Sequence, residues 1–340
     1  MFGRRQVSPR PISSGMLLNR RYRLQERLGE GGAGVIYKAE DEQLHRTVAI
    51  KLLLPGQGTM TEEKLARFQS EARSVARLNH PNIITLYDYE EVDGQPYLVI
   101  EYVPGVDLWE LDNQHTPNLM PFDESLPIID GILTALSYSH QHQVIHRDLK
   151  PENVMITPDR QVKVMDFGLA RIEGQSRLTQ NGLVAGTAAY LAPELALGEA
   201  GAHRGDLYAV GVILYELTTG RRPFSGDDPL TVISQHIHAP VVPPQHYNPE
   251  LPTDLQNLIL KLLAKTPDPR YLTADEARRD LAPILKRLKS RPETTTQTAL
   301  AVRRAGTITE AQTLLERILR GKMIGRAHEL EQLEKHWDHV

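Results

Sequence analysis

The sequence predicts an α+β fold, with a small β-rich unit followed by a larger and mainly helical one. Between residues 22 and 103, short runs of β-branched and aromatic residues are broken by Gly, Asp or Pro. Beyond Pro104-Gly105, apolar residues recur at helical spacing. The single Pro-Gly connection indicates two lobes with a cleft between them, and clefts between domains are favoured ligand sites.

The composition is that of an ordinary globular protein. Of the 340 residues, 40% are hydrophobic and 24% charged, and the length suggests about two domains. The net charge of −4 gives no indication of binding to nucleic acid or to an anionic membrane. The absence of cysteine excludes disulfides, thiolate metal sites and a Cys nucleophile. No apolar stretch approaches the ~20 residues of a membrane span, so a cytoplasmic protein is expected.

Four strand-like runs and one helix are expected in the β-rich unit. The runs are VIYKAE, TVAIKLLL, ITLYDYE and PYLVIEYV. The helix covers about residues 61–78 and has a periodic apolar face that includes Phe68 and Ala72. Thr59 and Glu62 fit a capping box at its start.

The helical unit and its flanks give the rest of the predicted organisation. Its clearest helices are expected at residues 128–141, 205–219, 255–264 and 273–288. The predicted parts of the chain are a basic tail (1–21), the β-rich unit (22–103), the helical unit (104–289), a polar linker (290–306) and a helical C-terminal segment (307–340).

A glycine-rich stretch, LGEGGAGV, begins at Leu28. Gly29, Gly31 and Gly34 fit G-x-G-x-x-G, which is also the pattern of dinucleotide-binding folds. In those folds a helix follows the glycines, whereas here another strand is expected. A glycine hairpin can bring backbone N–H groups close to phosphates because no Cβ intervenes. A flexible turn without a ligand is the alternative.

A lysine on the following strand is a second candidate. Lys51 lies in VAIK, and Glu71 on the one helix of the β-rich unit would be its counterpart. A lone lysine there is more often a solvated edge residue. An exposed Lys–Glu pair adds only ~0–1 kcal/mol to stability, so holding an ammonium against phosphate is the better reason to align the two.

Five ordered motifs then resemble one family. They are the glycine stretch with Val35, VAIK with Lys51, HRDLKPEN from His146 to Asn153, Asp166-Phe167-Gly168, and Ala192-Pro193-Glu194. The chain is similar to eukaryotic-like Ser/Thr protein kinases, most of all to bacterial receptor-type ones, over residues 22–288. The resemblance implies a bilobal kinase fold, ATP and Mg²⁺ as cofactors, and protein substrates.

The resemblance also implies catalytic roles. Asp148 would accept the proton of the substrate hydroxyl, and Lys150 would neutralise the γ-phosphate. Asn153 and Asp166 would hold Mg²⁺, while Lys51, positioned by Glu71, would bind the α- and β-phosphates. Thr187 would help to seat the acceptor side chain.

An ATP pocket carries over by position. Leu28, the three glycines, Val35, Ala49 and Met155 would surround the nucleotide, Ile100 would gate the pocket behind the adenine, and backbone groups of Glu101 and Val103 would bond its edge. Asp107 would reach the ribose, although a helix cap is an equally good interpretation of an Asp there. His146, Asp206 and the pair Glu194–Arg270 are assigned to structure.

Regulation is expected in the segment between Asp166 and Glu194. Arg147 precedes the catalytic Asp, which in the family indicates a loop phosphate. Thr179 is the expected phosphosite and Ser176 the next candidate, with phosphorylation in trans within a homodimer. Docking of a following domain is the alternative means of ordering the loop.

Two questions stay open at this stage. The stretch MIGRAHELEQLEKHW resembles the opening of AAA-like signalling ATPase domains, and a C-terminal helix docked on the kinase is the alternative. The function is expected to be that of an active Ser/Thr kinase. The alternative is an ATP-binding pseudokinase or scaffold, although such proteins usually lack the Lys, the catalytic Asp or the metal-binding Asp.

Overall fold

The chain divides into two units, Met1–Leu288 and Lys289–Val340, in a computed structural model. The structure describes residues 12–31, 34–53, 62–115, 119–167, 188–199 and 203–290. The first unit contains two sheets and a group of helices. The sequence predictions for the linker and the C-terminal segment lie outside the described residues, apart from Ser290.

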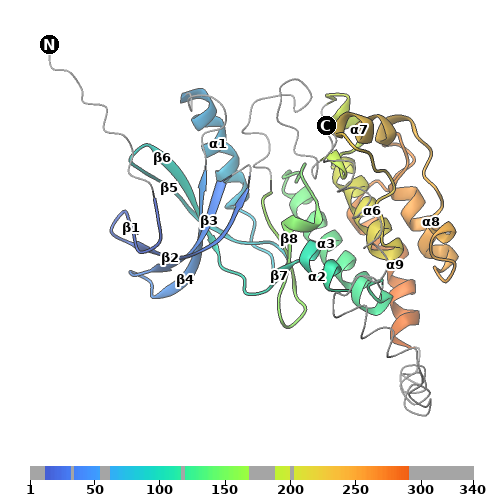
Figure 1. Cartoon of the computed structure of the whole chain (residues 1–340), viewed down its shortest axis with the longest axis horizontal. Helices are drawn as coiled ribbons and strands as arrows, with labels where there is room; N and C mark the ends of the chain where they lie inside the picture. The colour runs from blue at the N-terminus through green and yellow to red at the C-terminus, as the bar shows by residue number, and fades with distance from the viewer. Residues whose placement is uncertain are drawn as a thin grey trace, which may run out of the picture. The chain divides into compact units, whose positions relative to one another are not determined.

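A six-stranded antiparallel sheet forms the N-terminal part of the first unit (Figure 1), with strand order β1-β2-β3-β4-β6-β5. The strands are β1 Leu17–Leu18, β2 Tyr22–Gly31, β3 Gly34–Asp41, β4 Arg46–Leu53, β5 Leu86–Val92 and β6 Gln95–Glu101. The four predicted runs correspond to β3 to β6. The predicted helix is α1, Glu62–Val75, which ends a little earlier than expected.

The two faces of this sheet pack into different cores, because side chains alternate along a strand. Ala49, Leu98 and Ile100 belong to the large core that continues into the helical part. Tyr37 and Ile50 belong to a separate core on the other face. The first of these faces is therefore the one that faces the rest of the unit.

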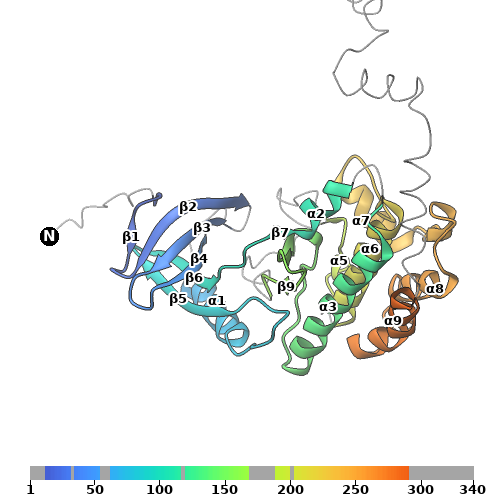
Figure 2. The ribbon, with the colours of Figure 1, turned by 90° about the horizontal axis from the view of Figure 1, so that it is seen from below.

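A second, three-stranded sheet and the helices form the C-terminal part (Figure 2). The strands are β7 Val106–Asp107, β8 Val154–Ile156 and β9 Val162–Val164. The helices are α2 Leu108–His115, α3 Phe122–Gln141, α5 Pro193–Ala196, α6 Arg204–Thr219, α7 Pro229–His238, α8 Thr253–Leu262 and α9 Ala274–Lys289. This arrangement confirms the predicted α+β fold with a sheet-rich first part and a helical second part.

Two helices that the sequence did not mark clearly begin at aspartate caps. The Asp107 carboxylate accepts the N–H of Glu110 at 2.8 Å at the start of α2, which confirms the cap interpretation of Asp107. The Asp228 carboxylate accepts the N–H of Thr231 at 2.9 Å at the start of α7, and Pro229 occupies the first helical position.

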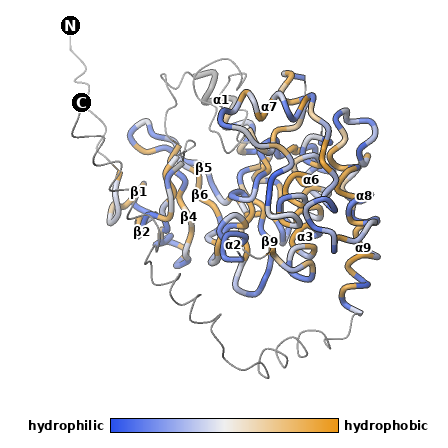
Figure 3. The backbone as a smooth tube through the Cα atoms, turned by 45° about the vertical axis from the view of Figure 1, so that its right-hand side comes forward, coloured by the Kyte–Doolittle hydropathy of each residue, from blue (hydrophilic) through white to orange (hydrophobic). Residues whose placement is uncertain are grey.

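Helix α6 is the centre of the helical part, with buried residues on all its sides. At Gly211 an added Cβ would lie 2.7 Å from the Cβ of Leu262 on α8, so the two helices approach closely at this point. Helix α9, by contrast, alternates between hydrophilic and hydrophobic residues (Figure 3) and buries one face that includes Leu281 and Ile284. Among the described residues, no helix is both long and apolar enough to span a bilayer.

Candidate active site

The polar stretch after Val144 is a loop held by one buried carboxylate. Asp206, 1% exposed at the start of α6, accepts the backbone N–H of His146 at 2.9 Å and of Arg147 at 2.8 Å. Its carboxylate also lies 2.8 Å from Nε2 of His140 on α3. Arg147 has φ 66°, a strained value for a residue with a side chain. The predicted structural role of Asp206 is confirmed.

Asp206 stays ionised although it is buried. Burial by itself would raise the pKa of its carboxyl, but the hydrogen bond with His140 and the nearby His146 and Arg147 N–H hold that pKa below its ordinary value. A charged acceptor makes stronger hydrogen bonds than a neutral one. The loop backbone at His146 and Arg147 is therefore firmly fixed to α6.

Two side chains of the loop, those of Lys150 and Asn153, lie next to Asp148. The Lys150 ammonium lies 3.7 Å from the Asp148 carboxylate, and both side chains are about one-fifth exposed. Asn153 is buried, and its Nδ2 donates to the backbone carbonyl of Asp148 at 2.7 Å. Because the amide nitrogen is engaged in this bond, the oxygen is the part of Asn153 that can act as a ligand.

Asp166 lies next to this loop at the end of β9. It has φ 62°, and the carbonyl of the preceding Met165 accepts from Nε2 of His146 at 2.8 Å. The N–H of Met165 donates to the carbonyl of Asn153 at 2.9 Å. These bonds join Asp166 and Asn153, which are far apart in sequence, to one small region of the fold.

Lys51 reaches this region from β4. Its ammonium lies 2.7 Å from the Asp166 carboxylate, and the side chain is only 6% exposed. Glu71, which the sequence paired with Lys51, lies partly buried on α1. The Lys51–Asp166 contact was not predicted, because it joins residues 115 positions apart.

Four of the residues assigned to the nucleotide are brought together in two pairs. Ala49 on β4 lies opposite Ile100 on β6, on the inward face of the large sheet. Asp107 lies opposite Met155 in the small sheet. The N–H of Glu101 donates to the Thr85 carbonyl at 2.9 Å, which leaves its own carbonyl as the group that a ligand could use.

The assignment of Val35 to this pocket is wrong. Val35 lies opposite Leu52 and packs in the core on the other face of the sheet, with Tyr37 and Ile50. Its neighbour Ile36 lies opposite Lys51 and packs against the inward core. Because directly opposed residues of an antiparallel pair share a face, Ile36 is the pocket residue that the sequence analysis missed. The period-two alternation between β3 and β4 could have found it.

The glycine stretch is a β-hairpin, as expected, since Gly31 of β2 pairs with Gly34 of β3. At Gly34 φ is 148°, and a Cβ would overlap the backbone carbonyl of Leu52, so only glycine fits there. At Gly29 a Cβ would meet no atom of the described residues within 4 Å, and Leu28 beside it is 46% exposed. Packing against the described residues therefore does not explain the glycine at position 29.

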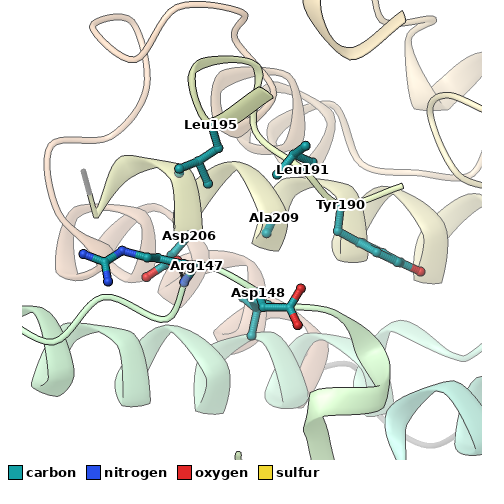
Figure 4. Close-up of a pocket in the computed structure, with 9 residues that line it drawn as sticks. Arg147, Asp148, Tyr190, Leu191, Leu195, Asp206 and Ala209 are labelled. Atoms are coloured by element: carbon teal, nitrogen blue, oxygen red, sulfur yellow. Dashed lines mark hydrogen bonds between the residues drawn. The ribbon is translucent and has the colours of Figure 1, made fainter. Parts of the chain in front are cut away.

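A small pocket opens beside Asp148 (Figure 4), lined by Arg147, Tyr190, Leu191, Leu195 and Ala209 among others. The Arg147 side chain points away from the Asp148 carboxylate. Glu194, next to Leu195 in α5, forms a buried bidentate salt bridge with Arg270, as predicted. The two hydrogen bonds are 2.7 and 2.9 Å long. Gly168, Ser176, Thr179 and Thr187 lie outside the described residues.

The chain belongs to the protein kinase domain family, whose model matches residues 22–280. Its sequence is similar to that of the bacterial serine/threonine-protein kinase PknB, and the fold and family expected from the five motifs are confirmed.

Three relatives indicate the branch of the family. The chain is 43% identical over 269 residues to the serine/threonine-protein kinase PknB of Mycobacterium leprae, a match that covers 78% of this chain and 43% of that protein. It is 45% identical over 274 residues to a probable serine/threonine-protein kinase of Streptomyces coelicolor, covering 79% and 40%. The crystal structure of the Mycobacterium tuberculosis PknI kinase domain matches with TM-score 0.64 and 28% identity, covering 80% of this chain and 99% of that one. The chain thus spans less than half the length of the first two.

Proposed function

We propose that the chain is an active kinase, which transfers the γ-phosphoryl group of ATP to Ser or Thr hydroxyls of proteins. The observation that carries this proposal is the convergence of Lys51, Asp148, Asn153 and Asp166 from three separate segments. A pseudokinase or scaffold would not need this set, because binding alone does not require a base beside a metal site.

The residues present fit Mg²⁺-ATP. Asn153 and Asp166 offer only oxygen ligands, which is the donor type that Mg²⁺ prefers. The buried Lys51 ammonium, now on Asp166, supplies a cation for phosphate oxygens. The open space at Gly29 leaves room for phosphates to approach the backbone. When bound, ATP would supply the phosphoryl group, and Mg²⁺ would supply positive charge that offsets the negative charge of the phosphates.

The other residues act on the acceptor. Asp148 would orient the substrate hydroxyl and accept its proton, and Lys150 would hold positive charge beside the transferred group. Thr187 would seat the acceptor side chain. Ala49, Ile36 and Met155 would enclose the adenine, Ile100 would limit the pocket behind it, and Glu101 and Val103 would bond its edge.

The test compares two substitutions with the wild-type chain. Asp148→Asn should lose most phosphoryl transfer while keeping Mg²⁺-ATP affinity, whereas Asp166→Asn should lose transfer and also bind Mg²⁺-ATP more weakly. Radiolabelled ATP with a synthetic peptide of residues 173–184 measures transfer, and calorimetry measures binding. Transfer at the wild-type rate in either variant would refute the proposal. Because this peptide contains no Tyr, the acceptor class is tested on the chain itself, and phosphotyrosine as its main autophosphorylation product would refute that class.

Regulation by phosphorylation is part of the same proposal. Arg147 is fixed by Asp206 with its guanidinium directed away from Asp148 (Figure 4), so it could receive a phosphate without disturbing the base. Thr179, or Ser176 in its place, would carry that phosphate after transfer in trans within a homodimer. Equal activity of phosphatase-treated and untreated enzyme would exclude this switch and favour ordering by a following domain, such as an ATPase domain.

Because ATP is an intracellular cofactor, the proposal places the enzyme in the cytoplasm.

A further inference from the structure

A fully buried histidine lies beneath the segment that lines the pocket beside Asp148. His236, on α7, is 0% exposed. Its ring contacts Tyr208 of α6 edge-on at 5.6 Å between centroids and Phe224 at 4.9 Å. None of the roles proposed above uses this side chain.

One ring nitrogen of His236 has a partner and the other does not. Nδ1 lies 2.8 Å from the hydroxyl of Tyr208. Nε2 is buried and, within the described part of the chain, reaches no group with hydrogen-bond geometry. A buried polar atom without a partner is uncommon and usually has a reason.

The groups around His236 determine which nitrogen of its imidazole carries the proton. Burial, with the positive charge of Lys265 nearby, lowers the pKa of His236 to about 4, so the ring is neutral near pH 7. Burial raises the pKa of Tyr208, so its hydroxyl keeps its proton and can donate to Nδ1. The proton of the ring then lies on Nε2. The backbone of Ala189 lies near enough to the imidazole to favour a proton on the ring, although Nε2 has no partner with hydrogen-bond geometry among the described residues.

Helix α7 also packs against the same segment through apolar side chains. Ala188, Ala196 and Ile233 form a small buried core of their own, with Leu191 and Ile237 against it. Tyr190 and Leu191 line the pocket beside Asp148. A shift of α7 would therefore reach the pocket through the backbone at residues 188–191.

The far side of His236 is held in place. The ammonium of Lys265 donates to the carbonyls of Gln235 at 3.0 Å and His236 at 2.6 Å, and it lies 4.0 Å from the centroid of the Phe224 ring. The guanidinium of Arg270 lies 4.8 Å from the centroid of the Tyr208 ring and binds Glu194. The ring of His236 thus has a fixed position on α7, next to the segment that contains Ala189.

We infer that His236 is a positioning residue for acceptor binding: its Nε2–H donates to the Ala189 carbonyl and sets the backbone of residues 188–191 when a protein substrate is engaged. This inference rests on the proposed kinase function. It assigns His236 no contact with substrate.

Two substitutions in the full chain separate this role from a packing role. His236→Asn keeps an acceptor near the position of Nδ1 for Tyr208 but cannot reach Ala189. His236→Gln places an amide donor near the position of Nε2. We expect the KM for the peptide of residues 173–184 to rise about 2- to 10-fold in the Asn variant, the range of one hydrogen bond, with the KM for ATP unchanged. The Gln variant should restore the KM for the peptide.

A second measurement does not depend on activity. Amide hydrogen exchange at residues 188–191, followed by mass spectrometry, should be faster in the Asn variant than in wild type and should recover in the Gln variant. Wild-type KM and wild-type exchange in the Asn variant would overturn the inference, as would equal losses in both variants that track their melting temperatures. If the wild type transfers no phosphate but the exchange rates change as expected, the proposed function fails, and only the effect of His236 on the backbone of residues 188–191 stands.

Discussion

The pKa values of two carboxyl groups of this chain, those of Asp206 and Glu216, are shifted in opposite directions. Asp206 keeps its charge because three donors surround it. Glu216, on α6, lies in the opposite situation. Burial raises the pKa of its carboxyl to about 6, and the nearby Asp112 and Glu152 add to this, although the Tyr190 hydroxyl donates to it. Glu216 should therefore be the more pH-sensitive of the two.

Glu216 should make the protein less stable as the pH rises. Its folded pKa of about 6 exceeds the ordinary value of 4.5, so the folded state binds more protons between these two values. The free energy of unfolding should fall by about 2 kcal/mol through this group between pH 4.5 and 7, relative to Glu216→Gln, which cannot titrate but still accepts from Tyr190. Urea unfolding of both proteins across this range measures the difference. Parallel pH curves for the two would contradict the assignment.

At the scale of residues, the sequence predicted the positions of the candidate catalytic residues better than it predicted the directions of their side chains. The motif positions of Lys51, Asp148, Asn153 and Asp166 were predicted, because their spacing is distinctive. The face of Val35 was not, since a motif gives a position along a strand but not the side on which the residue lies. The partner of Lys51 depends on how distant strands pack, which spacing does not contain.

At the scale of elements, caps and close approaches set the helices that hold the site. The periodic pattern predicted the four clearest helices, but α3 begins at Phe122 rather than at residue 128 and contains Pro127, a residue that is unfavourable inside a helix. The sequence did not mark α7, although Asp228 and Pro229 form a start signal. The ten residues of α7 pack against the segment that contains Ala188 and Leu191, beside Asp148. A helix that the sequence did not predict therefore supports a site whose residues it did predict.

Gly211→Ala tests the close approach of α6 and α8. Alanine gains about 1 kcal/mol in helix propensity, but its Cβ would lie 2.7 Å from that of Leu262, and overpacking costs about 1–3 kcal/mol. We expect a lower midpoint of thermal unfolding. Gly205→Ala, also in α6, is the matched control, because its Cβ would lie 3.3 Å from the end of the Leu195 side chain, 3.4 Å from Oε1 of Glu194 and 3.6 Å from the Cβ of Ala192. These contacts are longer than the one at Gly211, so Gly205→Ala should cost less stability. A Gly211→Ala protein at least as stable as wild type would show that α6 and α8 can move slightly apart without a loss in the free energy of unfolding.

At the scale of the whole molecule, the family match and the division of the chain suggest where the enzyme ends. The match ends at residue 280 and the first unit at Leu288. Helix α9 closes that unit, with Leu281 and Ile284 in the core. We therefore propose that the residues needed for phosphoryl transfer lie before residue 290.

Truncation tests this boundary. A chain of residues 1–290 should unfold in one cooperative transition and phosphorylate the peptide of residues 173–184 with the kcat/KM of the full chain. A second truncation, after residue 280, should unfold at a lower temperature, because it removes the apolar face of α9. Lower stability or activity of the 1–290 chain would instead favour the interpretation of the C-terminal segment as a helix docked on the kinase.

The single carboxylate that holds the catalytic loop also has a consequence for how the protein is made. Asp206 follows His146 by 60 residues. At a translation rate of about 5–20 residues per second, the loop waits roughly 3–12 s for its anchor to be added. During that interval every residue of the HRDLKPEN stretch has been joined to the chain, but the N–H groups of His146 and Arg147 have no carboxylate to bind. The growing polypeptide therefore cannot fix the backbone of this loop through Asp206 until α6 has been synthesised and packed.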